Sequence, residues 1–137
     1  MSANNIRKVI EKVTYDSLST YGIYIDFNEE GGDGKNEFVR VNSPFIITQP
    51  ADIGSKLLSE TGSVTIQVFA MGKNRCLEIY DILAKSFNVG KHVIEYNTRL
   101  NVTSISNDFA GRDSAGRFYQ VNFSIEFYSY EVISWEM

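Results

Sequence analysis

The segment Gly62–Phe87, GSVTIQVFAMGKNRCLEIYDILAKSF, changes its hydrophobic period at its centre. Apolar and polar residues alternate from Val64 to Ala70, as in a β-strand whose two faces meet different surroundings. After Gly72 the apolar residues recur every three or four positions, which is typical of an amphipathic helix. These helical positions are Cys76, Ile79, Tyr80, Leu83 and Phe87. The segment therefore predicts a strand, a tight turn and a helix.

Similar patterns on both sides of this segment predict further elements. Ile6, Val9, Ile10 and Val13 mark one face of a first helix, and Tyr119–Phe127 has the longest strict alternation in the chain. The remaining expectations are a β-hairpin made of 21–27 and 38–41, an edge or irregular piece at 45–48, a polar connection at 51–61, paired strands at 91–96 and 99–106, and a mobile connection at 107–117. The pattern predicts an α+β fold in one domain, residues 1–137. We expect a mixed or antiparallel sheet of about four to six strands with two main helices packed on one face.

The composition excludes several classes of protein. A chain of 137 residues can bury roughly two-thirds of its unfolded surface as one domain. The net charge of −4 and the pI near 5.0 argue against a partner held mainly by phosphate contacts, so nucleic-acid binding is not expected as the main function. The polar start of the chain does not have the pattern of a signal peptide, and the chain contains no apolar run of roughly 20 residues, so we expect a cytoplasmic protein without membrane contact.

The sequence contains no recognisable catalytic site. His92 is the single histidine and Cys76 the single cysteine, and Cys76 falls on the apolar side of the second helix, where a thiolate is disfavoured. No nucleophile, base and orienting group occur together, and no glycine-rich phosphate-binding motif is present. We therefore expect neither enzymatic activity nor a cofactor, and the pattern favours a binding or assembly role.

A calcium-binding site is the most specific alternative function that the residues suggest. The segment from Asp26 to Glu37 places Asp26, Asn28, Glu30, Gly31 and Glu37 at positions 1, 3, 5, 6 and 12 of an EF-hand loop. The flanking segments are β-like, whereas an EF-hand needs a helix on each side. Position 8 is the acidic Asp33 instead of an aliphatic residue. A solvated, glycine-rich loop is the favoured interpretation, and no metal site is predicted.

Two segments of the sequence resemble segments of a known protein family. They are TIQVFAMGKNRCLEIYDILAKSF, from Thr65 to Phe87, and RFYQVNFSIEFYSYE, from Arg117 to Glu131. With the order of the elements around them, they resemble the tail terminator proteins of long-tailed bacteriophages, the group similar to the lambda tail terminator. The resemblance implies a small structural subunit in the virion, assembled in the host cytoplasm. It implies a homo-hexameric ring that caps the tail tube, stops its growth and joins it to a head or neck protein.

Under this resemblance, two charged loops are the candidate contact regions with neighbouring subunits or with the tail tube. The proposed contact residues are Glu30, Asp33, Lys35, Phe109, Arg112, Asp113 and Arg117. Another head–tail connector or tail-completion protein of similar size is the nearest alternative. A small calcium- or ligand-binding module is the alternative from a different class.

Overall fold

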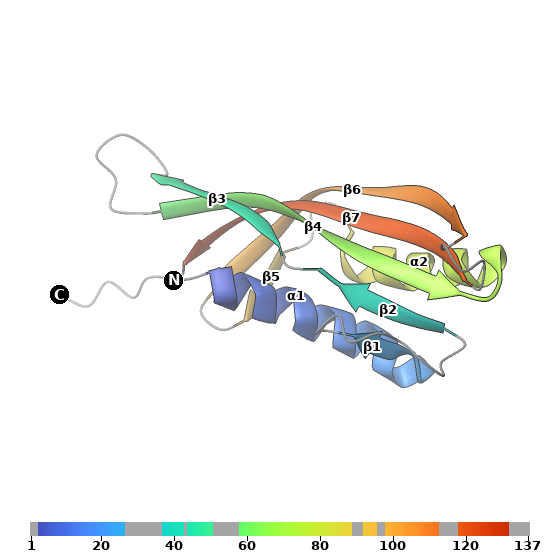
Figure 1. Ribbon diagram of the computed structural model, residues 1–137. Helices are drawn as coiled ribbons and strands as arrows, with labels where there is room; N and C mark the ends of the chain where they lie inside the picture. Colours follow the sequence, from blue (N-terminus) through green and yellow to red (C-terminus); the bar gives the residue numbers. More distant parts are fainter. Residues whose placement is uncertain are drawn as a thin grey trace.

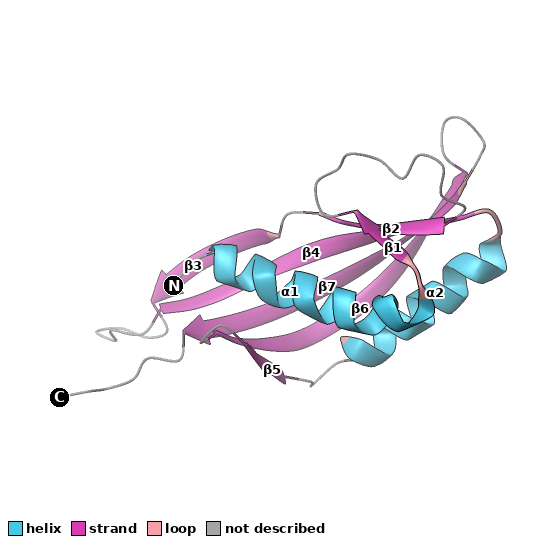
Figure 2. Ribbon diagram, turned by 90° about the horizontal axis from the view of Figure 1, so that it is seen from below, coloured by secondary structure: helices cyan, strands magenta, loops and turns pink. Residues whose placement is uncertain are grey.

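The computed structural model describes residues 3–26, 37–42, 44–50, 58–88, 92–95, 98–112 and 118–131. In these ranges two helices lie side by side across one face of a twisted seven-stranded sheet (Figures 1 and 2). The helices are α1, Ala3–Leu18, which continues into the short 3₁₀ helix η1, Ser19–Tyr21, and α2, Lys73–Ser86. The predicted α+β class, with two helices on one face, is therefore confirmed.

Six strands follow one another across the sheet in the order β1-β2-β4-β7-β6-β5, and β3 pairs with β4 beside β2. The strands are β1 Tyr24–Asp26, β2 Glu37–Val41, β3 Phe45–Pro50, β4 Leu58–Ala70, β5 His92–Glu95, β6 Thr98–Arg112 and β7 Tyr119–Glu131. β1 and β2 run parallel, and all the other pairs are antiparallel. The long strands β4, β7 and β6 form the centre of the sheet.

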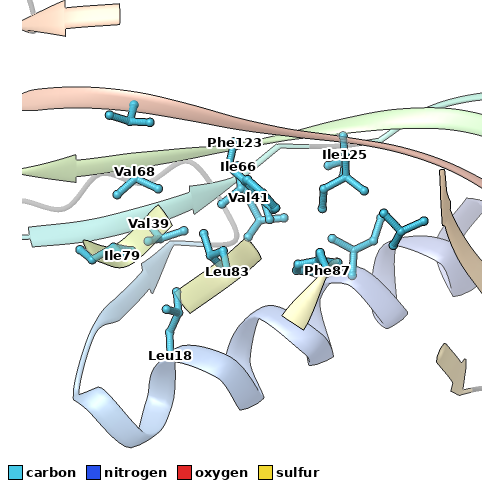
Figure 3. Close-up of a cluster of buried hydrophobic side chains, with 14 of the residues drawn as sticks. Leu18, Val39, Val41, Ile66, Val68, Ile79, Leu83, Phe87, Phe123 and Ile125 are labelled. Atoms are coloured by element: carbon cyan, nitrogen blue, oxygen red, sulfur yellow. The ribbon is translucent and has the colours of Figure 1, made fainter. Parts of the chain in front are cut away.

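The hydrophobic core lies between the sheet and the helices (Figure 3). Alternate residues of β4 and β7 point into it, and α2 covers them with the periodic side chains that the sequence identifies. Phe123 is the central contact, because its ring meets Tyr80 edge-on at 5.2 Å and Phe87 at 6.0 Å between centroids. Each fully buried large side chain contributes roughly 1.5–3 kcal/mol. The change of period between β4 and α2 therefore determines how the two layers meet.

The predicted hairpin of residues 21–27 and 38–41 is wrong. β1 pairs with β2 in parallel, with Tyr24 opposite Phe38 and Asp26 opposite Arg40. The antiparallel neighbour of β2 is β4, so β1 adds to the outer edge of β2. A strand of three residues spans only about 10 Å, and the ten residues numbered 27–36 are long enough to return over that distance. The sequence pattern does not distinguish the two directions for so short a strand.

Two predicted connections are strands in part. Residues 58–61, expected in a polar connection, begin β4 and pair with both β3 and β7. Residues 107–112, expected in a mobile connection, continue β6 along β7. Asn107 and Asp108 are exposed to solvent, whereas Glu60 is buried. In both segments the backbone groups are satisfied by neighbouring strands. Gly111 has a φ of 85° and lies at a register shift, where a left-handed residue fits a β-bulge.

Candidate interaction surfaces

Of the seven predicted contact residues, the structure describes Phe109 and Arg112, and it places both at one end of the sheet. Glu37, Ala70, Tyr119 and Arg112 are successive partners in one row across β2, β4, β7 and β6. We call this row the loop end, because both predicted contact loops join the sheet there. Three inter-strand spacings separate Glu37 from Arg112, about 14 Å. Phe109 and Arg112 belong to β6, whereas Glu30, Asp33, Lys35, Asp113 and Arg117 lie outside the described residues.

A small aromatic cluster fixes the loop end on the sheet face opposite the helices. Phe38 stacks on Phe69 with 4.6 Å between ring centroids, and Phe118 meets Phe38 edge-on at 5.4 Å. All three rings are buried. Phe38 follows the first predicted contact loop directly, and Phe118 follows the second. The cluster therefore holds Phe38 and Phe118 against β4, with each aromatic pair contributing roughly 0.5–1.5 kcal/mol beyond its burial.

Arginines hold the two carboxylates at the ends of the EF-hand-like segment. Arg40 Nε donates to Asp26 Oδ2 at 3.2 Å, and Arg40 also lies over the rings of Phe38 and Phe69. Arg75 binds Glu37 through two hydrogen bonds of 2.9 and 2.8 Å. Because β1 is parallel to β2, Asp26 lies beside Arg40, three residues or about 10 Å along the strand from Glu37. This arrangement does not fit an EF-hand loop, in which both residues bind the same ion.

Arg75 also connects the loop end to α2. Its Nη1 donates to Glu78 Oε2 at 3.0 Å, so one guanidinium joins two carboxylates. The hydrogen bonds that Arg75 donates to Glu37 are the main reason that the pKa of Arg75 lies above its ordinary value, and the bond that it donates to Glu78 adds to the effect. A bidentate pair of this kind restricts the orientation of both side chains more than a single bond would. The start of β2 is thereby held against the first turn of α2.

Phe109 is an exposed aromatic on the helix side of the loop end. Its ring stacks on Tyr119 at 6.1 Å, and the ammonium group of Lys73 lies 5.0 Å from its centroid. Met71, in the turn between β4 and α2, is 54% exposed. We call Met71, Lys73 and Phe109 the basic patch. It presents apolar surface beside a positive charge, a combination common at protein interfaces.

A second candidate surface lies further along the sheet, on its open face, and sequence analysis did not find it. Phe45 and Ile47 of β3, with Tyr128 of β7, border an open hollow of about 360 Å³. Phe45 is 67% exposed and Ile47 is 51% exposed. The hollow lies near the register shift between Val102 and Ser104 of β6. We call Phe45, Ile47, Tyr128 and Glu126 the acidic hollow, because Glu126 is the one charged residue among its described lining residues.

The short apolar run at residues 45–47 was the available signal for this second surface, because an edge strand cannot bury three successive apolar side chains on one face. Phe45 and Ile47 are exposed, and Ile46 between them packs against the core. β3 is an edge strand, as the flanking prolines predicted. The sequence did not indicate that β7 brings Tyr128 and Glu126 beside it, since these residues lie about 80 positions further along the chain. That contact depends on the long-range pairing of β4 with β7.

The centre of the open face is polar. Thr65 and Ser124 hydroxyls are 3.2 Å apart, Gln120 donates to Asn122 at 2.8 Å, and Ser104 donates to Glu126 at 3.1 Å. Lys and Arg are absent from the described segments 63–67, 104–108 and 120–126. A surface of hydroxyls, amides and carboxylates provides no cluster of positive charge for phosphate groups.

Cys76 is a buried structural thiol. Its Sγ donates to the carbonyl oxygen of Tyr119 at 3.2 Å, and burial raises the pKa of the thiol. His92 begins β5 opposite Asn101. Over the described ranges, no three His, Cys, Asp or Glu side chains group closely enough to hold a metal ion. None of the helices within the same ranges is long and apolar enough to cross a membrane.

Comparisons with known proteins identify the fold. No family model matches the chain, and no curated protein matches it. One solved chain, whose name gives no function, has a TM-score of 0.69 at 17% identity, with 98% of this chain and 99% of that chain covered. A chain from the virion of a native gene transfer agent particle has a TM-score of 0.62 at 11% identity, with 86% and 91% covered. This chain is similar to both in fold across most of its length.

Proposed function

We propose that this chain is a structural subunit of a phage-like virion, located at the tail end near the neck. It forms a closed ring on the tail tube, stops tube growth and provides the joint to the head. Two findings support the proposal. The fold is shared with a chain from a gene transfer agent virion, and the sequence independently resembles phage tail terminators. The shared fold is the observation that carries the argument.

The distribution of surfaces is consistent with an assembly role. The basic patch and the acidic hollow lie at different positions along the long central strands, so one subunit can contact two neighbours at once. Contacts between two different patches form rings when the rotation between subunits closes. Under the proposal, one face of the ring binds the last ring of the tube and the other binds a head or neck protein. Growth stops because the exposed face does not offer the contacts that the next tube ring needs.

Deletion of the gene from the particle that encodes it tests this role. Electron microscopy of the resulting particles should reveal tails of abnormal length that are detached from heads. Expression of the wild-type chain in trans should restore normal, attached tails, which controls for effects on neighbouring genes. Tails of normal length that remain unattached would favour a connector that acts after tube growth has ended. Normal tails firmly attached to full heads would contradict the proposal.

A further inference from the structure

We propose that neighbouring copies of this chain meet through the two surfaces defined above, with the basic patch of one copy seated in the acidic hollow of the next. The proposal rests on the ring of the proposed function and adds the contact that builds it. The occupant of the hollow is a second copy of this chain. The contact is heterologous, since two different patches of the same molecule meet.

The acidic hollow includes β3, an edge strand that pairs with β4 alone among the described strands. Natural proteins usually cover a sheet edge or mark it with charged residues, because its free backbone groups and apolar side chains can pair with another chain. β3 has the sequence FIITQP and contains no charged residue. Its outward residues Phe45 and Ile47 are the most exposed apolar side chains on the open face. Such a surface is typical of one that is covered in the assembled state.

The hollow is better suited to side chains than to a small ligand. Its volume of about 360 Å³ lies near the lower limit for small-molecule pockets, which are roughly 300–1,000 Å³, and it is open to solvent. Glu126 lies at its border with one hydrogen bond, from Ser104. Within the described ranges, no Lys or Arg forms an ion pair with Glu126. A partner with large apolar side chains and one positive charge would match the hollow.

The basic patch has those properties. Met71 and Phe109 are both exposed. Lys73 is the first residue of α2, and its ammonium group lies over the Phe109 ring. The neighbouring Arg75 is occupied by Glu37 and Glu78, whereas Lys73 makes no ion pair among the described residues. Its ammonium group is therefore available to Glu126 of another copy. The two patches are complementary in both apolar character and charge.

The positions of the two patches prevent them from meeting within one molecule. Ser63 of β4 lies at the hollow and Ala70 lies at the loop end, seven residues apart along one continuous strand. At about 3.3 Å per residue, this separation is roughly 23 Å. The strand is paired on both sides and cannot fold back on itself. The complementary surfaces can therefore meet only between copies, in a head-to-tail arrangement.

Cysteine cross-linking between two variants tests this contact directly. Ile47→Cys and Met71→Cys each introduce one exposed thiol, and the buried Cys76 provides no accessible one. With a short bismaleimide, each variant alone should give no specific product. An equal mixture should give a cross-linked dimer containing a peptide joined at positions 47 and 71. The double variant should give a ladder of larger species, because each copy then links to two neighbours.

Charge reversal provides the second part of the test. Lys73→Glu and Glu126→Lys should each weaken association, measured by sedimentation, by about tenfold or more, since like charges then face each other. The variant that combines both changes should recover association to within about threefold of wild type. Lys85→Glu, at the other end of α2, should have little effect. A negative charge at Lys73, at the helix start, favours the helix, so weaker association would not reflect unfolding.

The possible outcomes of these two experiments distinguish failure of the proposed contact from failure of the proposed ring. If the wild-type protein forms rings but the mixed cysteine variants give no 47–71 product, or if both charge reversals leave association unchanged, the contact is overturned and the ring is left intact. A product from Ile47→Cys alone would indicate a symmetric contact and would also overturn it. If the wild-type chain stays monomeric at every concentration and the mixed cysteine variants give no 47–71 product, the result counts against the contact and the ring together. The predicted product with rescue by the double reversal would establish the contact.

Discussion

At the scale of single residues, the backbone of β3 passes so close to Gly62 that it leaves no room for a side chain there. A Cβ atom at Gly62 would lie 2.1 Å from the carbonyl oxygen of Phe45 and 3.1 Å from the ring of Phe127. A backbone atom at that distance cannot rotate away, so β3 has to shift. We predict that Gly62→Ala lowers the free energy of unfolding by about 1–3 kcal/mol, measured by urea denaturation.

Gly72 provides the matched control for this prediction. It precedes α2, and a Cβ atom there has no heavy atom within 4 Å. Gly72→Ala should therefore change stability by no more than about 1 kcal/mol, the usual size of a change at a helix N-cap. Equal effects of the two alanine substitutions would show that the close approach of β3 does not constrain position 62.

Cys76 gives a prediction about chemical reactivity. The thiol is buried, donates to the carbonyl of Tyr119, and has a pKa raised by that burial. Iodoacetamide at pH 8 should therefore modify the native protein at least roughly a hundredfold more slowly than the urea-unfolded chain. Local opening that costs about 3 kcal/mol already gives this factor. Rapid modification of the native protein would contradict the assigned burial.

The same raised pKa sets the direction of a pH effect on stability. Below the ordinary thiol pKa of about 8.5, both the native and the unfolded chain carry the protonated thiol, and its contribution to stability is complete. As the pH rises through the higher native pKa, this contribution is lost, because the unfolded thiol ionises first. A Cys76→Ser variant should lack this part of the alkaline decrease in stability, which urea titrations between pH 8 and 10 would measure.

At the scale of elements, the cluster of Phe38, Phe69 and Phe118 joins β2, β4 and the start of β7. We predict that Phe38→Ala and Phe118→Ala each destabilise the protein by about 3 kcal/mol or more, because each removes a buried ring. The double variant should lose less than the sum, with a coupling of about 0.5–1.5 kcal/mol for the edge-on pair. Strict additivity in urea denaturation would show that the two rings do not interact. Tyr15→Ala, at an exposed site on α1, should have an effect within about 0.5 kcal/mol.

The sequence predicted those elements whose own side chains determine them. β4 and α2 differ in hydrophobic period, and β7 alternates without interruption, so local pattern and burial agree there. The parallel pairing of β1 could not be predicted, because three residues carry no information about direction. The extension of β6 to Arg112 was missed for another reason. Asn107 and Asp108 are poor strand formers by themselves, and their strand conformation depends on the ladder with β7.

The candidate surfaces were predictable only in part, because they too depend on pairing between strands that lie far apart in the sequence. Phe109 and Arg112 were chosen because of a charged, glycine-containing segment, and both lie in β6 at the loop end. The acidic hollow required knowledge of which distant strands are neighbours. The alternation of Tyr119–Phe127 indicates only that Glu126 lies on the polar side of a strand. Its place near Phe45 follows from the pairing of β4 with both β3 and β7. Such contacts are set by the whole sheet and not by any local segment.

At the scale of the whole molecule, the account describes an asymmetric building block. Helices cover one face of the sheet (Figure 2), and the open face carries the exposed side chains of Phe45 and Ile47 away from the loop end. A subunit of this kind can associate directionally, and in the ring that we propose, closure would limit the assembly to a defined number of copies. We therefore predict that the purified chain acts in less than stoichiometric amounts relative to tube subunits, because one ring per tube end is sufficient.

The most direct test of the capping claim is the length of tail tubes assembled in its presence. Tube protein from the same particle would be allowed to polymerise with increasing amounts of this chain, and tube lengths would be measured by negative-stain electron microscopy. The account predicts that mean tube length falls as the chain is added, with one ring of extra density at a single end of each tube. Tube lengths that do not change at any ratio, with no density at either end, would contradict it.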